Sequence, residues 1–198
     1  MAEHYFDESP SSDDRRQDVS VTVWGHERVF TTASGVFSLD GIDKATDVLL
    51  RSSTPPTGGT LLDLGCGWGV IACSLASEST TVWAVDVNPR ALELTRANAE
   101  RHGLDVTTAS PDDVPADLTF DEIWSNPPIR IGKKALHDLL LRWLPRLRPD
   151  GVARLVVGKN LGADSLQRWL VDQGWPTTRV GSEKGFRILE VTRGPRTA

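Results

Sequence analysis

Residues 63–69 combine the types and spacing of a ligand-binding turn. They read Asp-Leu-Gly-Cys-Gly-Trp-Gly and lie between a short apolar run and a helical pattern. Glycine lets the backbone approach a ligand closely, and the first turn of a helix offers amide donors. Asp86 follows the next apolar run, where a carboxylate could accept from both hydroxyls of a ribose. Val70 fills the sixth place of the dinucleotide fingerprint G-x-G-x-x-G, which argues against a pyrophosphate cofactor.

A second chemical motif, Ser125-Asn126-Pro127-Pro128, follows a later apolar run. An exocyclic amine on a nucleobase is a poor nucleophile because its lone pair is delocalised into the ring. The Asn126 side-chain oxygen and the Pro127 carbonyl could accept its two hydrogens and direct that lone pair at an electrophile. Two consecutive prolines fix the backbone, and we expect their carbonyls to lack competing local N–H groups. The alternative interpretation is a rigid turn after a strand.

Alternating strand and helix patterns would position both motifs. Strands are expected at residues 61–64, 81–85, 106–109, 120–124, 152–157, near 179 and at 186–191. Helices are expected at residues 70–76, 89–102, 133–147 and 165–173, with Pro145 ending or kinking the third. This order predicts an α/β fold: a Rossmann-like, doubly wound, mostly parallel sheet of seven strands, the last antiparallel. Both motifs then lie at the carboxyl edge of the sheet, where such folds bind ligands.

The segment before this sheet has a different pattern. Residues 19–30 alternate apolar and polar side chains around Gly25, which predicts a β-hairpin, and residues 43–50 predict a short helix. We therefore divide the chain into an N-terminal extension, residues 1–58, and a catalytic domain, residues 59–198.

Length and composition exclude several classes of protein. A chain of 198 residues with 39% hydrophobic residues can bury a substantial core, so it is not disordered as a whole. No apolar run reaches the length of a membrane span, and the acidic start lacks the apolar core of a signal peptide. Cys66 and Cys73 form neither a metal-binding pattern nor a disulfide framework. We expect a reduced, cytoplasmic protein without a metal or a membrane partner.

Charge is distributed unevenly along the chain. The net charge of −5 argues against nucleic-acid binding by bulk attraction. Residues 128–160, however, carry eight basic residues against two acidic ones. The basic residues are Arg130, Lys133, Lys134, Arg142, Arg146, Arg148, Arg154 and Lys159. They are either solvated surface charges or a confined face for an anionic substrate.

The D-L-G-C-G-x-G run followed by Asp86 resembles the S-adenosylmethionine site of class I methyltransferases. By that resemblance, the ribose and methionine of the donor would lie on Gly65, Cys66, Gly67 and Gly69, and Asp63 would reach the amino group of the donor directly or through water. Trp68, inside the turn, would lie near the donor. Val87 and Asn88 would flank the adenine. An acid after the third strand usually meets the adenine amino group; Asp112 and Asp113 both qualify, and we favour Asp112.

Asn126-Pro127-Pro128 resembles the N-P-P-[YFW] motif of methyltransferases that act on amines of adenine, guanine or glutamine, with Ile129 in place of the aromatic residue. N-P-P-I-R followed by G-K-K is similar to small methyltransferases related to the bacterial guanine-N2-methyltransferases of 16S ribosomal RNA. The resemblance extends over nearly the whole chain, from His4-Tyr5-Phe6 through residues 35–38 to residues 184–186.

This resemblance implies an enzyme that transfers a methyl group from S-adenosylmethionine to the N2 amine of a guanine in ribosomal RNA, leaving S-adenosylhomocysteine. It implies that Phe37 lies beside the donor, that Ile129 contacts the base, and that Arg130, Lys133 and Lys134 hold flanking phosphates. The expected partner is ribosomal RNA or the small ribosomal subunit, without an obligate protein partner. Alternatives are another amine acceptor (23S guanine, adenine N6, transfer RNA or protein glutamine), a donor-binding RNA chaperone without turnover, and a less favoured NAD oxidoreductase.

Overall fold

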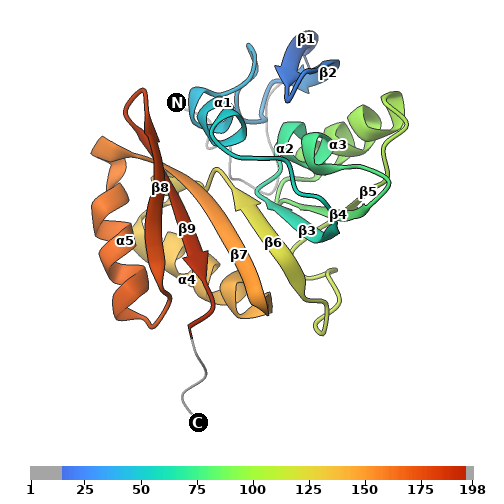
Figure 1. The fold of residues 1–198 in the computed structure, drawn as a ribbon. Coiled ribbons are helices and arrows are strands. Elements are labelled where there is room, and N and C mark those ends of the chain that lie inside the picture. The colour runs from blue at the N-terminus through green and yellow to red at the C-terminus, as the bar shows by residue number, and fades with distance from the viewer. Residues whose placement is uncertain (1–14, 195–198) are drawn as a thin grey trace.

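A computed structural model describes residues 15–194 (Figure 1). A two-stranded hairpin precedes a seven-stranded sheet with helices on both faces. The strands are β1 Arg16–Val23, β2 His26–Ala33, β3 Gly59–Leu64, β4 Thr80–Val85, β5 Val106–Ala109, β6 Phe120–Ser125, β7 Leu147–Gly158, β8 Thr177–Glu183 and β9 Phe186–Thr192. The α-helices are α1 Lys44–Arg51, α2 Val70–Leu75, α3 Pro89–Arg101, α4 Lys133–Trp143 and α5 Ala163–Asp172. Short 3₁₀ turns are η1 Ile129–Ile131, η2 Leu144–Arg146 and η3 Lys159–Leu161.

The strand order of the sheet is β5-β4-β3-β6-β7-β9-β8. Strands β3 to β7 pair in parallel, whereas β9 is antiparallel to both β7 and β8. The predicted seven-stranded, mostly parallel sheet with an antiparallel last strand is therefore confirmed, as is the N-terminal hairpin.

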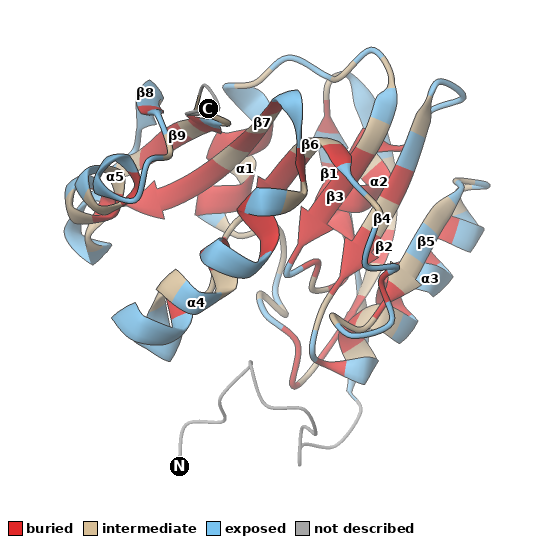
Figure 2. Ribbon diagram, turned by 90° about the horizontal axis from the view of Figure 1, so that it is seen from below, coloured by how far each residue is buried: buried red, intermediate tan, exposed pale blue. Residues whose placement is uncertain are grey.

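The central strands are largely buried, as their red colour in Figure 2 shows. Their alternating side chains belong to two separate cores. The hairpin and helices α1, α2 and α3 pack on one face, and α4 and α5 pack on the other. Val48, Leu49 and Leu50 of α1 are completely buried. Helix α1 lies on β7 and β9 and is therefore anchored close to the ends of the strands that carry the predicted motifs.

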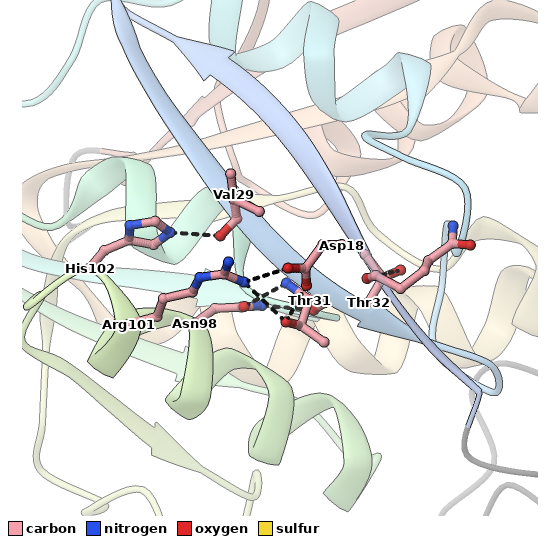
Figure 3. Close-up of polar contacts among 8 residues, drawn as sticks. Asp18, Val29, Thr31, Thr32, Asn98, Arg101 and His102 are labelled. Atoms are coloured by element: carbon pink, nitrogen blue, oxygen red, sulfur yellow. Dashed lines mark hydrogen bonds and ion pairs between the residues drawn. The ribbon is translucent and has the colours of Figure 1, made fainter.

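The hairpin is joined to α3 by polar contacts centred on the buried Asn98 (Figure 3). Asn98 accepts from the Thr31 amide at 2.8 Å and donates to the Thr31 carbonyl at 2.9 Å. Its Nδ2 also donates to the Trp68 carbonyl at 2.8 Å, in the glycine turn. His102 and Arg101 add contacts to Val29 and Asp18. One buried amide thus connects the N-terminal hairpin to the predicted ligand turn. The division of domains at residue 58 stays a prediction.

Hydrogen bonds tie the ends of three central strands together. The Ser125 hydroxyl donates to the Leu64 carbonyl at 2.7 Å, which fixes the end of β6 against β3. The amides of Gly65 and Cys66 donate to the Val85 carbonyl at 2.8 and 3.1 Å, which fixes the glycine turn against β4. The two sequence motifs are therefore brought to one edge of the sheet.

Two element boundaries differ from the sequence-based prediction by more than three residues. Helix α4 ends at Trp143, and Pro145 lies in η2, so the proline ends the helix. Strand β7 begins at Leu147 rather than 152, because Leu147 pairs with Phe120 before a register shift admits the exposed residues 148–150. The motif residues His4, Tyr5 and Phe6 lie outside the described residues. No helix within residues 15–194 is long and apolar enough to cross a membrane.

Candidate active site

A cavity of about 380 Å³ opens at the carboxyl edge of the sheet. Its volume is typical of a site for a small organic ligand. It is formed by the turn after β3, the end of β4, the turn after β6 and the segment that leads into α1. The predicted site residues that line it are Phe37, Gly65, Cys66, Gly67, Trp68, Asp86, Val87, Asn88, Asn126, Pro127, Pro128, Ile129 and Arg130. The cavity therefore unites the glycine turn, the acid and the Asn-Pro-Pro motif.

The glycines of the turn serve two different structural purposes: two leave space in the cavity, and one allows close packing against α3. A Cβ at Gly65 or Gly67 would meet no atom within 4 Å, and both residues line the cavity with positive φ angles of 78° and 56°. A side chain there would occupy the space that a ligand needs. A Cβ at Gly69 would lie 2.8 Å from Thr95 Oγ1. Gly69 does not line the cavity, and its missing side chain allows the turn to pack against α3.

Asp86 is held at the cavity wall by backbone amides. Its Oδ2 accepts from Gly67 N at 3.0 Å, and its Oδ1 accepts from Asn88 N at 2.9 Å. Burial raises the pKa of Asp86, while the amides of Asn88, Gly67 and Val87 act in the opposite direction. Each carboxylate oxygen has a further lone pair, so Asp86 can still accept from a ligand hydroxyl.

Asp63 lies behind the turn rather than in the cavity wall. It is completely buried, and its Oδ2 accepts from Ala72 N of α2 at 2.9 Å. Its Oδ1 has no hydrogen-bond partner among the described residues. Burial raises the pKa of Asp63 from 3.8 to about 8. The structure thus places Asp63 beside the turn without opening it to the cavity.

Cys66 lines the cavity but is not an activated nucleophile. Burial raises the pKa of its thiol well above the ordinary value, with Asp86 and Asp63 adding to the shift. The Thr95 hydroxyl donates to the sulfur at 3.4 Å. The protonated thiol contributes shape and packing rather than a thiolate.

The Asn126 side chain is oriented by α1. Its Nδ2 donates to Asp43 Oδ2 and to Thr46 Oγ1, each at 3.0 Å, and no described residue donates to its Oδ1. Asp43 and Thr46 also line the cavity, and sequence reasoning assigned neither to the site. The available signal was the position of Asp43 at the start of the helix predicted for residues 43–50, since an aspartate at that position often caps a helix.

The expectation that the proline carbonyls lack local N–H donors is wrong. The Ile129 amide donates to the Pro127 carbonyl at 2.8 Å, and the Ile131 amide donates to the Pro128 carbonyl at 3.1 Å. Pro128 has φ −73° and ψ 73°, the geometry of an inverse γ-turn, which turns the Ile129 amide back onto Pro127. The Pro127 carbonyl keeps one lone pair for a ligand.

Aromatic side chains reach the cavity from elements other than the Asn-Pro-Pro turn. Ile129 is half-buried in the wall, whereas Phe37 is 40% exposed, and Phe186 at the start of β9 is half-buried. Trp68 lines the cavity with only 3% of its surface exposed and packs against Phe30. Phe37 and Phe186 therefore offer rings that the turn lacks.

Besides Asp63 and Gly69, three predicted residues do not line this cavity: Asp112, Lys133 and Lys134. The Asp112 side chain is 89% exposed and forms an ion pair with Arg142, while its neighbour Pro111 lines the wall. Lys134 forms an exposed ion pair with Asp138. Lys133 lines a second cavity of about 180 Å³. Ile129 and Leu161 line both cavities, so Lys133 stays close to the site.

Most of the basic stretch has structural partners. Arg146 donates to the carbonyls of Pro115 and Leu118, Arg148 pairs with Asp121, and Arg154 pairs with Glu122. The side chains of Arg130, Lys133 and Lys159 have no hydrogen bond or ion pair within residues 15–194. These three remain available for an anionic ligand. No group of His, Cys, Asp or Glu side chains in that range is arranged to hold a metal ion, and the absence of a metal stays a prediction.

A family model described as the methyltransferase small domain matches residues 27–190. The chain is 34% identical over 200 residues to the uncharacterized protein YbxB of Bacillus subtilis, covering 98% of this chain and all of that one. It is 39% identical over 184 residues to ribosomal RNA small subunit methyltransferase C of Cronobacter sakazakii, covering 86% of this chain and 52% of that protein. The chain thus spans about half the length of the relatives that carry this name.

The fold also matches a solved structure. The 16S rRNA N2 G1207 methyltransferase (RsmC) of T. thermophilus, in complex with AdoMet and guanosine, superposes with a TM-score of 0.79 at 23% identity. The match covers 93% of this chain and 52% of that one. At this identity the likeness establishes the fold, which is that of class I methyltransferases.

Proposed function

The chain belongs to the methyltransferase small domain family, and on that basis we propose that it methylates the exocyclic N2 amine of a guanine in ribosomal RNA, with S-adenosylmethionine as the donor. One observation carries the proposal. The glycine turn with Asp86 and the Asn126-Pro127 pair, which lie in separate parts of the sequence, line the same cavity. A donor site and an acceptor site are therefore adjacent.

The cavity residues fit the donor. Gly65 and Gly67 leave open the space that a Cβ would fill, so the backbone can lie against the ribose and methionine portion. Asp86, in the cavity wall, can accept from the ribose hydroxyls, and Val87 and Asn88 beside it can flank the adenine. Asp63 does not open to the cavity, so its partnerless Oδ1 can reach a donor group only through a water held behind the turn. Asp112 can contact the adenine only when its exposed ion pair with Arg142 opens on donor binding.

Catalysis is then a matter of positioning. S-adenosylmethionine, when bound, supplies a methyl group on a positively charged sulfur. Asn126 Oδ1 and the second lone pair of the Pro127 carbonyl accept the two hydrogens of the amine and direct its lone pair at that methyl carbon. As the N–C bond forms, the amine nitrogen becomes acidic and loses one proton to solvent, so no strong base is needed. Pro128 contributes by holding the turn rigid.

The assignment to ribosomal RNA is supported by the names of the relatives and by the surface charge. Several relatives carry the name ribosomal RNA small subunit methyltransferase C. Arg130 lines the cavity, Lys133 lines the second cavity, and Lys159 follows Gly158 of the cavity wall. These three side chains can hold phosphates beside the site. Phe37 and Phe186 can stack on a base in the role that Ile129 cannot fill.

Transfer of a labelled methyl group tests the proposal. The protein is incubated with labelled S-adenosylmethionine and, separately, with unmodified small subunits, unmodified large subunits, transfer RNA and total protein, and the mark is then mapped. We expect N2-methylguanine in small-subunit RNA. A labelled methyl group on adenine N6, 23S guanine, transfer RNA or glutamine would overturn the assignment to small-subunit RNA and identify that acceptor as the substrate. Tight donor binding without any transfer would indicate the RNA chaperone instead.

A further inference from the structure

The two ends of the Asn126 amide have different surroundings. Its Nδ2 donates to Asp43 Oδ2 and Thr46 Oγ1 at 3.0 Å each, across 83 and 80 residues of sequence. Its Oδ1 receives no hydrogen bond from a described residue. All three residues line the cavity, so the unpaired oxygen is the end of the amide that a ligand can reach.

Chemistry allows only one orientation of this amide. An ionised carboxylate accepts hydrogen bonds and cannot donate them, so only the nitrogen end of the Asn126 amide can face Asp43. The Thr46 hydroxyl accepts from the same nitrogen. If the amide were flipped, its oxygen would lie against the carboxylate, and two N–H donors would face the substrate amine. The flipped amide could not accept the hydrogens of that amine.

Asp43 is itself held by the start of α1. The same Oδ2 accepts from Ala45 N at 2.8 Å and from Thr46 N at 3.3 Å, which makes Asp43 the N-cap of the helix. Val48, Leu49 and Leu50 bury the next turn of α1 against the sheet. The acceptor for Asn126 is therefore fixed in space by helix packing and not by a mobile loop.

We propose that Asp43 and Thr46 are positioning residues for methyl transfer. They hold Asn126 with its oxygen towards the substrate amine, and so residues 43–46 of the N-terminal extension complete the active site. This inference rests on the proposed role of Asn126, but it does not depend on which RNA or other amine acceptor is used.

The test uses three substitutions with different chemical effects. Asp43→Ser keeps an oxygen that can cap α1 but is too short to reach Asn126. Thr46→Val removes one acceptor at nearly constant volume. Asp43→Asn retains an acceptor oxygen and serves as the conservative variant. Asp47→Ser on the same helix is the matched control, because Asp47 pairs with Arg51 and does not touch Asn126.

We expect kcat to fall about 10–100-fold in Asp43→Ser and several-fold in Thr46→Val, as for loss of hydrogen bonds to a charged and a neutral group. Asp43→Asn should recover part of the Asp43→Ser loss. The Kd for S-adenosylmethionine and the melting temperature should stay close to those of Asp47→Ser. Wild-type kcat in both Asp43→Ser and Thr46→Val, or equal losses of kcat and donor affinity, would overturn the proposal.

A second measurement does not require turnover. In ¹H–¹⁵N spectra, the Asn126 side-chain NH₂ pair, identified by its loss in Asn126→Ala, should exchange slowly with solvent. It should shift and exchange faster in Asp43→Ser and Thr46→Val but not in Asp47→Ser. An NH₂ pair that exchanges as fast as an exposed asparagine would overturn the inference. If the wild type fails to methylate RNA while this pair is protected, the proposed function fails and the amide orientation stands.

Discussion

The backbone amide of Gly67 donates to Asp86 Oδ2 across 3.0 Å, which joins the glycine turn after β3 to the acid after β4. The carboxylate is therefore oriented before any ligand arrives. An oriented acceptor loses little conformational freedom on binding, so its hydrogen bonds to a ligand contribute more to affinity.

Asp86→Ala is expected to weaken S-adenosylmethionine binding by about 1.5–3 kcal/mol, the usual loss for hydrogen bonds to a charged group. Titration calorimetry measures this loss. Asp105→Ala is the control, because Asp105 is exposed and lies outside the cavity. An unchanged donor affinity in Asp86→Ala would remove the assignment.

The same calorimetry tests the predicted adenine contact of Asp112. Because Arg142 holds this carboxylate at the exposed surface, we expect Asp112→Asn to weaken donor binding much less than Asp86→Ala does. A comparable loss would mean that the Asp112–Arg142 pair opens when the donor binds.

Asn126→Ala should lower kcat by about 10²–10³-fold, the range observed when one preorganised donor or acceptor is removed from a reacting group. Donor binding should change less than about threefold, because the ribose and adenine contacts are assigned to other residues. Single-turnover kinetics and calorimetry separate the two effects. Asn160→Ala, at an exposed asparagine outside the cavity, should leave both unchanged.

Two glycine substitutions should differ in whether they lower mainly stability or mainly donor affinity. Gly69→Ala places a Cβ 2.8 Å from Thr95 Oγ1 at a φ of +88°, so we expect a loss of stability of about 2–4 kcal/mol from overpacking and backbone strain. Gly67→Ala meets no atom within 4 Å and should lose only the strain, about 1–2 kcal/mol. Its methyl group enters the cavity, so donor affinity should fall more in Gly67→Ala. Thermal unfolding measures the stability of both variants, and calorimetry measures their donor affinity. A larger stability loss in Gly67→Ala, or a larger loss of donor affinity in Gly69→Ala, would contradict the roles assigned to the two glycines.

Asp63 makes stability depend on pH. Burial raises its pKa from 3.8 to about 8, so between about pH 4 and pH 8 the folded protein retains a proton that the unfolded chain has released. This contribution to the free energy of unfolding is complete below the unfolded pKa, falls through that window and is constant above it. The stability of the wild type relative to Asp63→Asn should therefore decrease from pH 4 to pH 8 in urea unfolding. A constant difference would mean that folded Asp63 is ionised throughout.

Arg130→Ala and Lys133→Ala should weaken RNA binding without changing donor binding. If each side chain neutralises one phosphate of a single strand, each substitution should reduce the slope of log affinity against log salt by about 0.7. Arg179→Ala, at an exposed residue of the edge strand β8, is the control for overall charge. Salt slopes equal to that of Arg179→Ala would place the RNA elsewhere.

The fold was largely predictable because its signals are local. Apolar runs that end at Gly65 and Asp86 mark parallel strands, and Asn88 with Pro89 marks a helix start that the structure confirms. The start of β7 was not predictable, because Pro149 and Gly151 normally mark a loop, whereas here a register shift lets the exposed residues 148–150 continue the strand.

The site was predictable only in its backbone motifs. The contact of Asn126 with Asp43 spans 83 residues, and no periodicity or spacing reports which helix cap faces which strand end. Arg142 and Arg146 donate to backbone carbonyls, which carry no charge that a sequence would reveal. A count of charged residues therefore overestimated the number of basic side chains available for an anionic ligand. Contacts of this kind depend on tertiary packing and cannot be predicted from local patterns in a single sequence.

Asn98 couples the N-terminal hairpin to the glycine turn. Because the Asn98 side chain bonds both Thr31 and the Trp68 carbonyl, we expect loosening of β2 to disturb the backbone of the glycine turn. A shortened chain that starts at the first strand of the large sheet would keep every glycine of that turn and still lose the support that shapes it. We therefore expect ligand binding at the glycine turn to require β2.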